Sequence, residues 1–395
     1  MLERPPLPGT VMYRSAAHCL TLSLLAFCAP AFGAGQAPPA DVVTTPTITV
    51  SAARVPTPEE VFAIPADLRA MLQKQVIQRS YSRDQRLQAL VEMIFDQHGL
   101  DLQYDANATY IVSDIWQHRR ANCLAFTLLF VTLAREAGIQ ARVQEVGQVV
   151  SWYQDQDAGV VYSVGHVNAG VDVGWRFGTV DLDRNVLYDR RGPVPVSRAR
   201  ALAHFYNNRG AERLADGDFV GARAFFDASL AQDSGFAPVW NNLGVLDHRE
   251  GNNEAARQAL DRSLQLEGRQ DAALTNASAL FRSLGLTAQA QSLERRLKSV
   301  QREDPFAQYM FGAKAERAGQ LYQAIRYYRQ AVRLYDTAHQ FHFGLARVYF
   351  LAGQLKRADR ELLRAQELGG APEQARYQAK LDSLARWRAQ QQAKR

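Results

Sequence analysis

The feature that most constrains this chain is a period of 34 residues in its C-terminal half. Glycine recurs at this spacing at Gly217, Gly251, Gly285, Gly319 and Gly353. Alanine recurs at the same spacing at Ala222, Ala256, Ala290, Ala324 and Ala358. A fixed period of this size indicates stacked structural repeats, because one short unit cannot bury its apolar face alone.

Two further positions complete each unit. The earlier one is small and holds Gly210, Gly244, Ser278, Gly312 and Ala346. The later one holds Phe226, Leu260, Glu294, Tyr328 and Leu362. This pattern resembles the tetratricopeptide repeat over residues 203–370. The resemblance implies two antiparallel helices per unit, joined by a turn at the glycine, and a groove that binds a protein or peptide partner. Because Ser278 and Glu294 depart from the pattern, we expect looser packing or a local bend in the third copy.

The first 33 residues differ in kind from the rest. An apolar run from Cys19 through Phe32 follows two arginines, and small residues precede Ala34. This pattern is typical of a secretory signal peptide, so we expect the mature protein in the periplasm or outside the cell. Lipid attachment at Cys28 is disfavoured, because bulky Phe27 stands where lipoprotein sites have a small residue. No later apolar run is long enough to predict an integral membrane segment after leader cleavage.

Charge and cysteine content narrow the function classes. The formal net charge is +6, but basic and acidic residues alternate almost everywhere after residue 60. This arrangement gives no basic stripe, so we expect no nucleic-acid partner. Once the leader is removed, Cys123 is the single cysteine. It cannot form an internal disulfide, and it is either a buried inert thiol or a reactive one.

Composition also indicates how the middle of the chain is organised. The segment rich in Pro, Thr, Ala and Val that follows the leader has no helical period and predicts a disordered linker. Helical patterns come next, including a capping box at Ser82 and Gln85, and short valine-rich runs between residues 140 and 185 predict strands. Helices followed by a sheet predict an α+β domain. The expected segments are a signal peptide (1–33), the linker (34–62), the α+β domain (63–198), five helical repeats (199–370) and a polar C-terminal capping helix (371–395).

The region around Cys123 could carry chemistry. A strongly apolar helix is predicted from Cys123 to Gly138, with Asn122 as its N-cap. The free N–H groups and the dipole of the first turn stabilise a thiolate there, which activates a cysteine as a nucleophile. A thiolate needs a base, which His166 on a predicted strand can supply. The base needs an orienting acceptor, which Asp181 on the next strand can supply.

The order of these groups resembles the transglutaminase-like, papain-like cysteine superfamily over residues 80–190. The blocks that carry the resemblance are RRANCLAFTLLFVTLAREAGIQARVQEV, GHVNAGV and TVDLD. The resemblance implies that Cys123 is the nucleophile, His166 the general base, and Asp181 the residue that holds the imidazole tautomer. Family members often have a glycine two residues before the cysteine, whereas this chain has Ala121, whose Cβ could crowd a substrate.

Two parts of this assignment stay open. Asp183 is two residues beyond Asp181 on the same predicted strand and would face the same side. The second oxyanion donor, besides the Cys123 backbone N–H, could be Gln117, Trp116 or Asn122, of which Gln117 is preferred.

Metal sites are not expected, and no cofactor is implied. The run that starts at Asp181, Asp183 and Asn185 opens like a calcium loop but lacks the glycine and the closing glutamate that such a loop needs. His339 and His342 lie one helical turn apart, yet no third ligand accompanies them.

The sequence therefore predicts a multidomain chain in which an α+β papain/transglutaminase-like domain precedes an all-α repeat solenoid. The favoured function is a thiol enzyme that acts on an amide bond by hydrolysis or acyl transfer. The alternative is a non-catalytic periplasmic adaptor that uses its repeats and whose thiol domain is inactive.

Overall fold

A computed structural model describes most of the chain beyond the N-terminal region. The described residues are 54–146, 153–155, 160–162, 166–173, 176–182, 192–370, 374–375, 377–383 and 386. The predicted signal peptide, with Cys19 and Cys28, and the first part of the predicted linker lie outside these residues.

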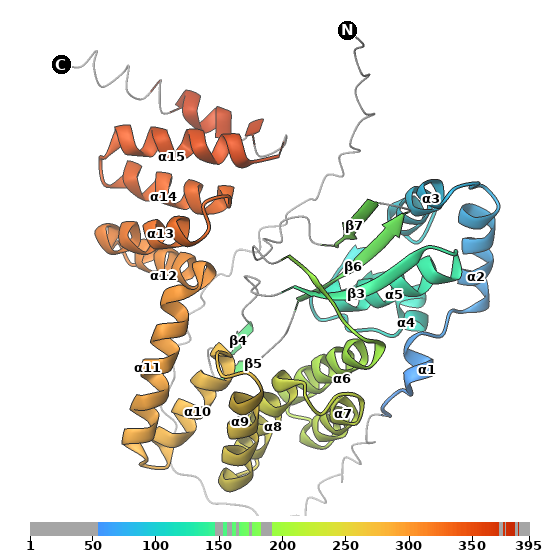
Figure 1. Ribbon diagram of the computed structural model, residues 1–395, viewed down its shortest axis with the longest axis horizontal. Helices are drawn as coiled ribbons and strands as arrows, with labels where there is room; N and C mark the ends of the chain where they lie inside the picture. Colours follow the sequence, from blue (N-terminus) through green and yellow to red (C-terminus); the bar gives the residue numbers. More distant parts are fainter. Residues whose placement is uncertain are drawn as a thin grey trace, which may run out of the picture. The chain divides into compact units, whose positions relative to one another are not determined.

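The first domain begins with helices (Figure 1). They are α1 (Pro58–Val61), α2 (Ala66–Leu72), the π-helical turn η1 (Gln73–Ile77), α3 (Arg83–Phe95), α4 (Val112–His118) and α5 (Cys123–Glu136). Short parallel strands β1 (Gln103–Tyr104) and β2 (Arg120–Ala121) frame α4. The predicted capping box of α3 is confirmed. The Ser82 hydroxyl accepts a 3.2 Å hydrogen bond from the Gln85 backbone amide, and the Gln85 side-chain oxygen accepts one from the Ser82 backbone amide.

An antiparallel sheet follows these helices. Within the described residues its order is β7 (Arg176–Val180), β6 (His166–Val173), β3 (Gln140–Val146) and β8 (Val194–Pro195). Strands β4 (Tyr153–Asp155) and β5 (Val160–Tyr162) pair separately. Helix α5 packs on the sheet, because Val167, Ala169 and Val171 of β6 share one core with its apolar side chains. The α+β prediction for this domain is confirmed.

The predicted linker extends too far toward the domain. Residues 54–62 include α1, whose Thr57 and Glu60 form a capping box, and Val61 is fully buried in the domain core. The Tyr206 hydroxyl also donates a 2.8 Å hydrogen bond to the Pro56 carbonyl. The prediction of a disordered linker was therefore wrong for residues 54–62, because a proline-rich composition gives little signal for a single capped helical turn.

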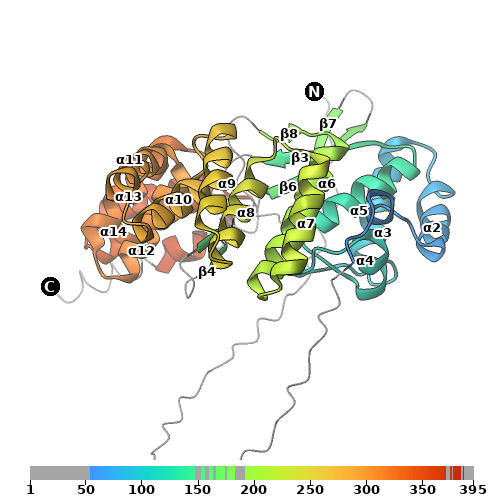
Figure 2. The same cartoon turned by 90° about the horizontal axis from the view of Figure 1, so that it is seen from below.

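Ten helices form pairs in the repeat region (Figures 1 and 2). The pairs are α6 (Arg198–Ala215) with α7 (Phe219–Gln232), α8 (Ala237–Arg249) with α9 (Asn253–Leu266), α10 (Asp271–Ser283) with α11 (Thr287–Glu303), α12 (Pro305–Arg317) with α13 (Leu321–Leu334), and α14 (His339–Leu351) with α15 (Leu355–Leu368). Each turn glycine of the 34-residue period has a positive φ, from 71° to 84°. Such backbone is strained for residues with a Cβ, which explains why glycine recurs there.

The small and bulky positions meet in the first, second and fourth units, as the pattern predicts. A Cβ added at Gly210 would lie 2.4 Å from Phe226, and one at Gly312 would lie 2.7 Å from Tyr328. The third copy differs, because Glu294 forms an ion pair with Arg282 instead of filling the core. The bulky residue therefore sets the distance between the two helices of a unit.

Helix α6 belongs to two cores. Ala201, Leu202 and Phe205 pack into the first domain, while Ala203 and Leu214 pack into the repeats. The first repeat is thus continuous with the α+β domain through this helix.

A polar contact joins the sheet to the same helix. His204 Nε2 of α6 donates to the carboxylate of Glu145 on β3 at 2.7 Å. Arg200 of α6 lies 3.5 Å from that carboxylate and 3.1 Å from Asp233. Burial raises the pKa of Glu145, but the hydrogen bond and the charge of His204 lower it more, so its pKa falls below the ordinary value.

Near the C-terminus, residues 377–383 are helical, and buried Tyr377 shares a core with Ala346, Leu362 and Ala365. The bounds of the predicted capping helix stay a prediction. Among the described residues, no helix combines the length and the hydropathy needed to cross a membrane.

Candidate functional site

The predicted nucleophile occupies the first position of a buried helix. Asn122 caps α5, since its side-chain Oδ1 accepts a 2.9 Å hydrogen bond from the Ala125 amide. Cys123 follows as the first helical residue, and it is partly exposed. The apolar side chains behind it, among them Phe126 and Phe130, are fully buried and hold the helix in the core. The position places the Cys123 sulfur where the unpaired N–H groups of the helix favour negative charge.

The predicted base lies at the start of β6. His166 pairs with Val146 of β3 in the sheet register. Its Nε2 atom donates a 2.8 Å hydrogen bond to Asp181 Oδ2, and the two side chains are only 5% and 7% exposed. Asp181 follows the last residue of β7, which pairs with β6. Asp181 is therefore brought to His166 by the pairing of neighbouring strands, as the sequence predicted.

The charge state of the imidazole follows from its surroundings. Burial lowers the pKa of His166, but hydrogen bonds to Asp181 and to Cys123, together with their charges, raise it to about 10. At neutral pH this imidazole carries a proton beside the Cys123 sulfur. The structure thus joins His166 to Asp181 by a hydrogen bond, and Cys123 acts on the pKa of the same imidazole.

One further residue of this site was missed from the sequence. Asn168 is fully buried, and its Nδ2 atom donates to Asp181 Oδ2 at 3.3 Å. It lies two residues after His166, and residues two apart on a strand face the same side. The alternation of β6 was the signal that could have identified it.

The oxyanion candidates fare differently. Gln117 lies on an exposed part of α4, and Trp116 beside it is partly buried with the Arg119 guanidinium 4.9 Å from its ring centre. Asn122 uses its Nδ2 atom to donate to Thr109 Oγ1 at 2.7 Å and its Oδ1 atom to cap α5. Both polar atoms of the Asn122 side chain are therefore already hydrogen-bonded. This argues against Asn122 as the second oxyanion donor.

The rival carboxylate and the weak metal candidates can be placed only in part. Asp183 and Asn185 lie outside the described residues. His339 Nδ1 lies 2.7 Å from the Tyr377 hydroxyl, and His342 Nδ1 lies 2.7 Å from Glu361. The part of the chain that the structure describes contains no group of three or more His, Cys, Asp or Glu side chains suited to a metal ion.

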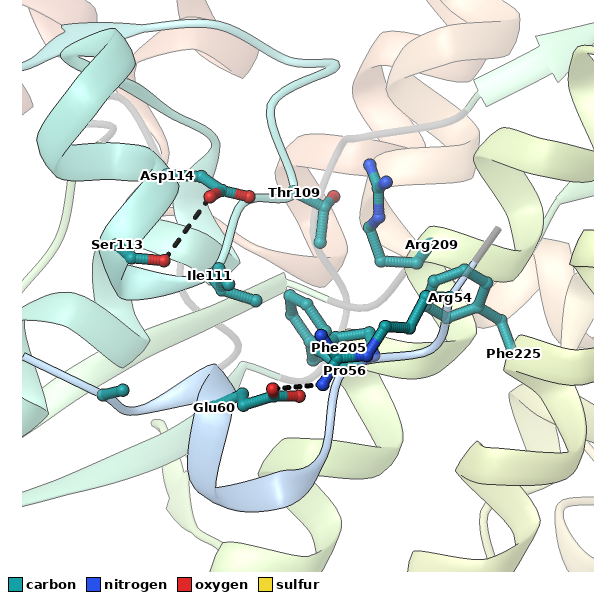
Figure 3. A pocket seen from close by; sticks show the side chains of 11 residues that line it. Arg54, Pro56, Glu60, Thr109, Ile111, Ser113, Asp114, Phe205, Arg209 and Phe225 are labelled. Atoms are coloured by element: carbon teal, nitrogen blue, oxygen red, sulfur yellow. Dashed lines mark hydrogen bonds and ion pairs between the residues drawn. The ribbon is translucent and has the colours of Figure 1, made fainter. Parts of the chain in front are cut away.

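A separate pocket lies between residues 54–63, the segment before α4, and the first two repeat helices (Figure 3). Its volume is about 350 Å³, and Phe205, Arg209 and Phe225 form its repeat-side wall. Thr109, which receives the hydrogen bond from Asn122, lines the opposite wall. Cys123, His166 and Asp181 do not line this pocket, so it is distinct from the triad.

Comparisons with known proteins agree with this two-part architecture. The family model described as transglutaminase-like superfamily matches residues 70–210, and a tetratricopeptide-repeat model matches residues 213–281. A search of the curated proteins gave no match.

Solved structures resemble part of the chain. MamA residues 41 to the end from Desulfovibrio magneticus RS-1 is 18% identical, with 42% of this chain and 94% of that chain covered and a TM-score of 0.24. PilF of Pseudomonas aeruginosa is 16% identical, with 44% of this chain and 79% of that chain covered and a TM-score of 0.26. YrrB, described as a tetratricopeptide-repeat protein with an unusual peptide-binding site, is 17% identical. The match covers 46% of this chain and 92% of that chain, with a TM-score of 0.26.

Proposed function

The chain joins a transglutaminase-like domain to tetratricopeptide repeats, and on this basis we propose that it is an exported thiol-dependent enzyme acting on an amide bond. The observation that carries the proposal is the buried 2.8 Å hydrogen bond between His166 and Asp181, and Cys123 acts on the same imidazole by raising its pKa. A buried imidazolium beside a thiol at a helix N-terminus is the arrangement that makes sulfur nucleophilic near neutral pH.

The reaction follows from these three side chains. The Cys123 sulfur, having passed its proton to His166, attacks the carbonyl carbon of the amide, and its electrons form the new S–C bond. The C–N bond then breaks, and the leaving amine takes the proton from His166. The resulting thioester is attacked by water or by a second amine, which restores the Cys123 thiol. Water gives hydrolysis, and an amine gives acyl transfer.

The repeats supply the second part of the proposal. Stacked helix pairs present an extended surface suited to a protein or peptide. We assign them the role of binding a protein partner, which brings its amide bond to the thiol domain or delivers the domain to its target. The predicted signal peptide supports placing this activity in the periplasm or outside the cell.

The proposal is tested first by thiol reactivity. The mature protein is treated with iodoacetamide at about pH 6, and alkylation of Cys123 is followed by mass spectrometry, beside the His166→Gln variant. An activated thiol reacts faster than an ordinary thiol at this pH, and the variant loses that advantage. If the wild-type thiol reacts as slowly as the variant, the protein is better described as a non-catalytic adaptor.

A second experiment looks for the intermediate. The protein is incubated with envelope extract, quenched in acid to preserve thioesters, and digested for mass spectrometry of the Cys123 peptide. We expect acyl adducts on this peptide in the wild type and a reduced yield in Asp181→Asn. Complete absence of adducts, despite a reactive thiol, would argue against amide-bond chemistry.

A further inference from the structure

Thr127 connects the helix of the thiol to the strand of the imidazole. It lies one turn after Cys123 on α5 and is fully buried. Its hydroxyl lies 2.7 Å from the Cys123 carbonyl oxygen and 3.3 Å from the Val167 carbonyl oxygen, so its single hydrogen is shared between the two acceptors. Val167 is the residue after His166 on β6. One hydroxyl group therefore bridges the backbone of the nucleophile and the backbone next to the base.

This bridge differs from the other contacts of the two elements. The remaining contact between α5 and β6 is largely apolar, involving Val167, Ala169 and Val171. Apolar packing is non-directional, so it resists separation of the helix from the strand more than it resists small sliding of one along the other. A hydrogen bond weakens steeply with distance and angle, so it opposes sliding as well.

A second threonine on the same helix shows what is particular to Thr127. Thr132 donates a 2.6 Å hydrogen bond to the Leu128 carbonyl, one turn back, as threonines in helices commonly do. Thr127 donates to the Cys123 carbonyl in the same way, but its hydroxyl hydrogen is shared with the Val167 carbonyl of the sheet. The bond to Val167 is therefore not a by-product of helical threonine geometry.

We propose that Thr127 is a positioning residue that fixes α5 along β6, so that the Cys123 sulfur meets the His166 ring. The inference rests on the proposed thiol chemistry. A misplacement of about 1 Å between reacting groups can cost roughly 100-fold in rate, so one directional bond between the two elements is enough to matter.

The test uses three variants of the full mature chain. Thr127→Val removes the hydroxyl and keeps the shape, Thr127→Ser keeps the hydroxyl, and Thr132→Val is the matched control. For each, the rate of Cys123 alkylation is measured from about pH 5 to pH 9, and the fold is checked by circular dichroism and thermal unfolding.

The expected result is specific to the bridge. Thr127→Val loses the fast alkylation below about pH 7, with a rate about 10- to 100-fold lower there and a profile that rises like that of an ordinary thiol. Thr127→Ser and Thr132→Val keep the wild-type profile. If Thr127→Val is folded and matches Thr132→Val, Thr127 is structural only and the inference fails.

The outcome also separates this inference from the proposed function. A wild-type thiol that reacts slowly and without dependence on His166 contradicts the proposed function itself. A fast wild-type thiol with an unchanged Thr127→Val profile contradicts the positioning role alone. If Thr127→Val does not fold, Thr127→Ala and Thr127→Ser are compared with the wild type, and an unchanged profile in a folded Thr127→Ala overturns the inference.

Discussion

Asn122 and Thr109 are joined by a buried hydrogen bond of 2.7 Å, donated by the Asn122 side-chain amide. The same amide caps α5 through its oxygen, so one side chain connects the helix that begins at Cys123 to the wall of the neighbouring pocket. The Asn122 backbone N–H also donates to the Ala108 carbonyl at 3.1 Å. Hydrogen bonds from Asn122 therefore anchor the N-terminus of α5 to the segment before α4.

Replacing Asn122 with alanine tests this anchor. Loss of a helix cap costs about 1 kcal/mol, and loss of the hydrogen bond to Thr109 adds about 0.5–1.5 kcal/mol. We expect the Asn122→Ala variant to be destabilised by about 1.5–2.5 kcal/mol in urea unfolding. Because the freed first turn carries Cys123, alkylation at about pH 6 should also slow severalfold.

Ser82→Ala provides the control for that prediction. Ser82 caps α3 in the same way, but in an exposed position away from the thiol. The Ser82→Ala variant should lose about 1 kcal/mol of unfolding free energy, and its Cys123 should keep the wild-type alkylation rate. Equal effects of the two variants on the thiol would show that alkylation follows overall stability rather than the α5 cap.

The carboxylate partner of His166 gives a second prediction. Asp181→Asn keeps the side-chain shape but removes the charge that holds the imidazole proton, so the pKa of His166 should fall. Hydrogen bonds to charged groups contribute about 1.5–3 kcal/mol, equivalent to about 10- to 100-fold in thiol reactivity near pH 6. The measurements are an NMR titration of His166 and the alkylation rate of Cys123.

Asp172→Asn is the matched variant for this comparison. Asp172 lies on the same strand as His166, six residues further along, where strand alternation gives it the same face. It should change neither the His166 titration nor the alkylation rate. A His166 titration that is the same in Asp181→Asn and in the wild type would exclude Asp181 as the orienting acceptor.

Stability should depend on pH through His166. Burial lowers its pKa, but the bonds to Asp181 and Cys123 raise it to about 10, above the unfolded value near 6.5. The native state therefore binds this proton more tightly than the unfolded chain does. The resulting stability is complete below about pH 6.5 and is lost as the pH rises through about 10.

The corresponding measurement compares unfolding free energies of wild type and His166→Gln at several pH values. The advantage of the wild type should be largest near pH 6 and should shrink by up to about 5 kcal/mol by pH 10. An advantage that grows with pH would mean that the native imidazole is neutral.

Much of this architecture could be predicted from local sequence patterns. The 34-residue period located the repeat glycines, and the Asn122 cap marked the start of α5, because both signals can be read along the sequence without knowledge of tertiary contacts. The triad residues were identified because their order along the chain matches helix, strand and neighbouring strand. Their meeting depends on the pairing of β6 with β7, which the sequence suggests only as adjacent strands.

The parts that could not be predicted depend on contacts between distant segments. Thr127 and Asn168 occupy ordinary positions in a helix and a strand. Their roles arise because α5 packs against β6 and because Asp181 follows the end of β7. Asn122 was a candidate oxyanion donor because the sequence does not reveal Thr109 as its partner. The helix at residues 58–61 was missed because its stability comes from burying Val61 in a core built by later residues.

The spacing of the repeat helices yields the last prediction. A Cβ at Gly210 would lie 2.4 Å from the Phe226 ring, closer than side chains tolerate, so Gly210→Ala should force α6 and α7 apart. Overpacking of this kind costs about 1–3 kcal/mol.

In the fifth repeat the equivalent positions hold Ala346 and Leu362, which share one core cluster. The double variant Gly210→Ala/Phe226→Leu copies that pair and should recover part of the stability lost by Gly210→Ala. A thermodynamic cycle of the two single variants and the double variant measures this coupling. Effects that add within about 0.5 kcal/mol would show that Phe226 does not set the helix spacing.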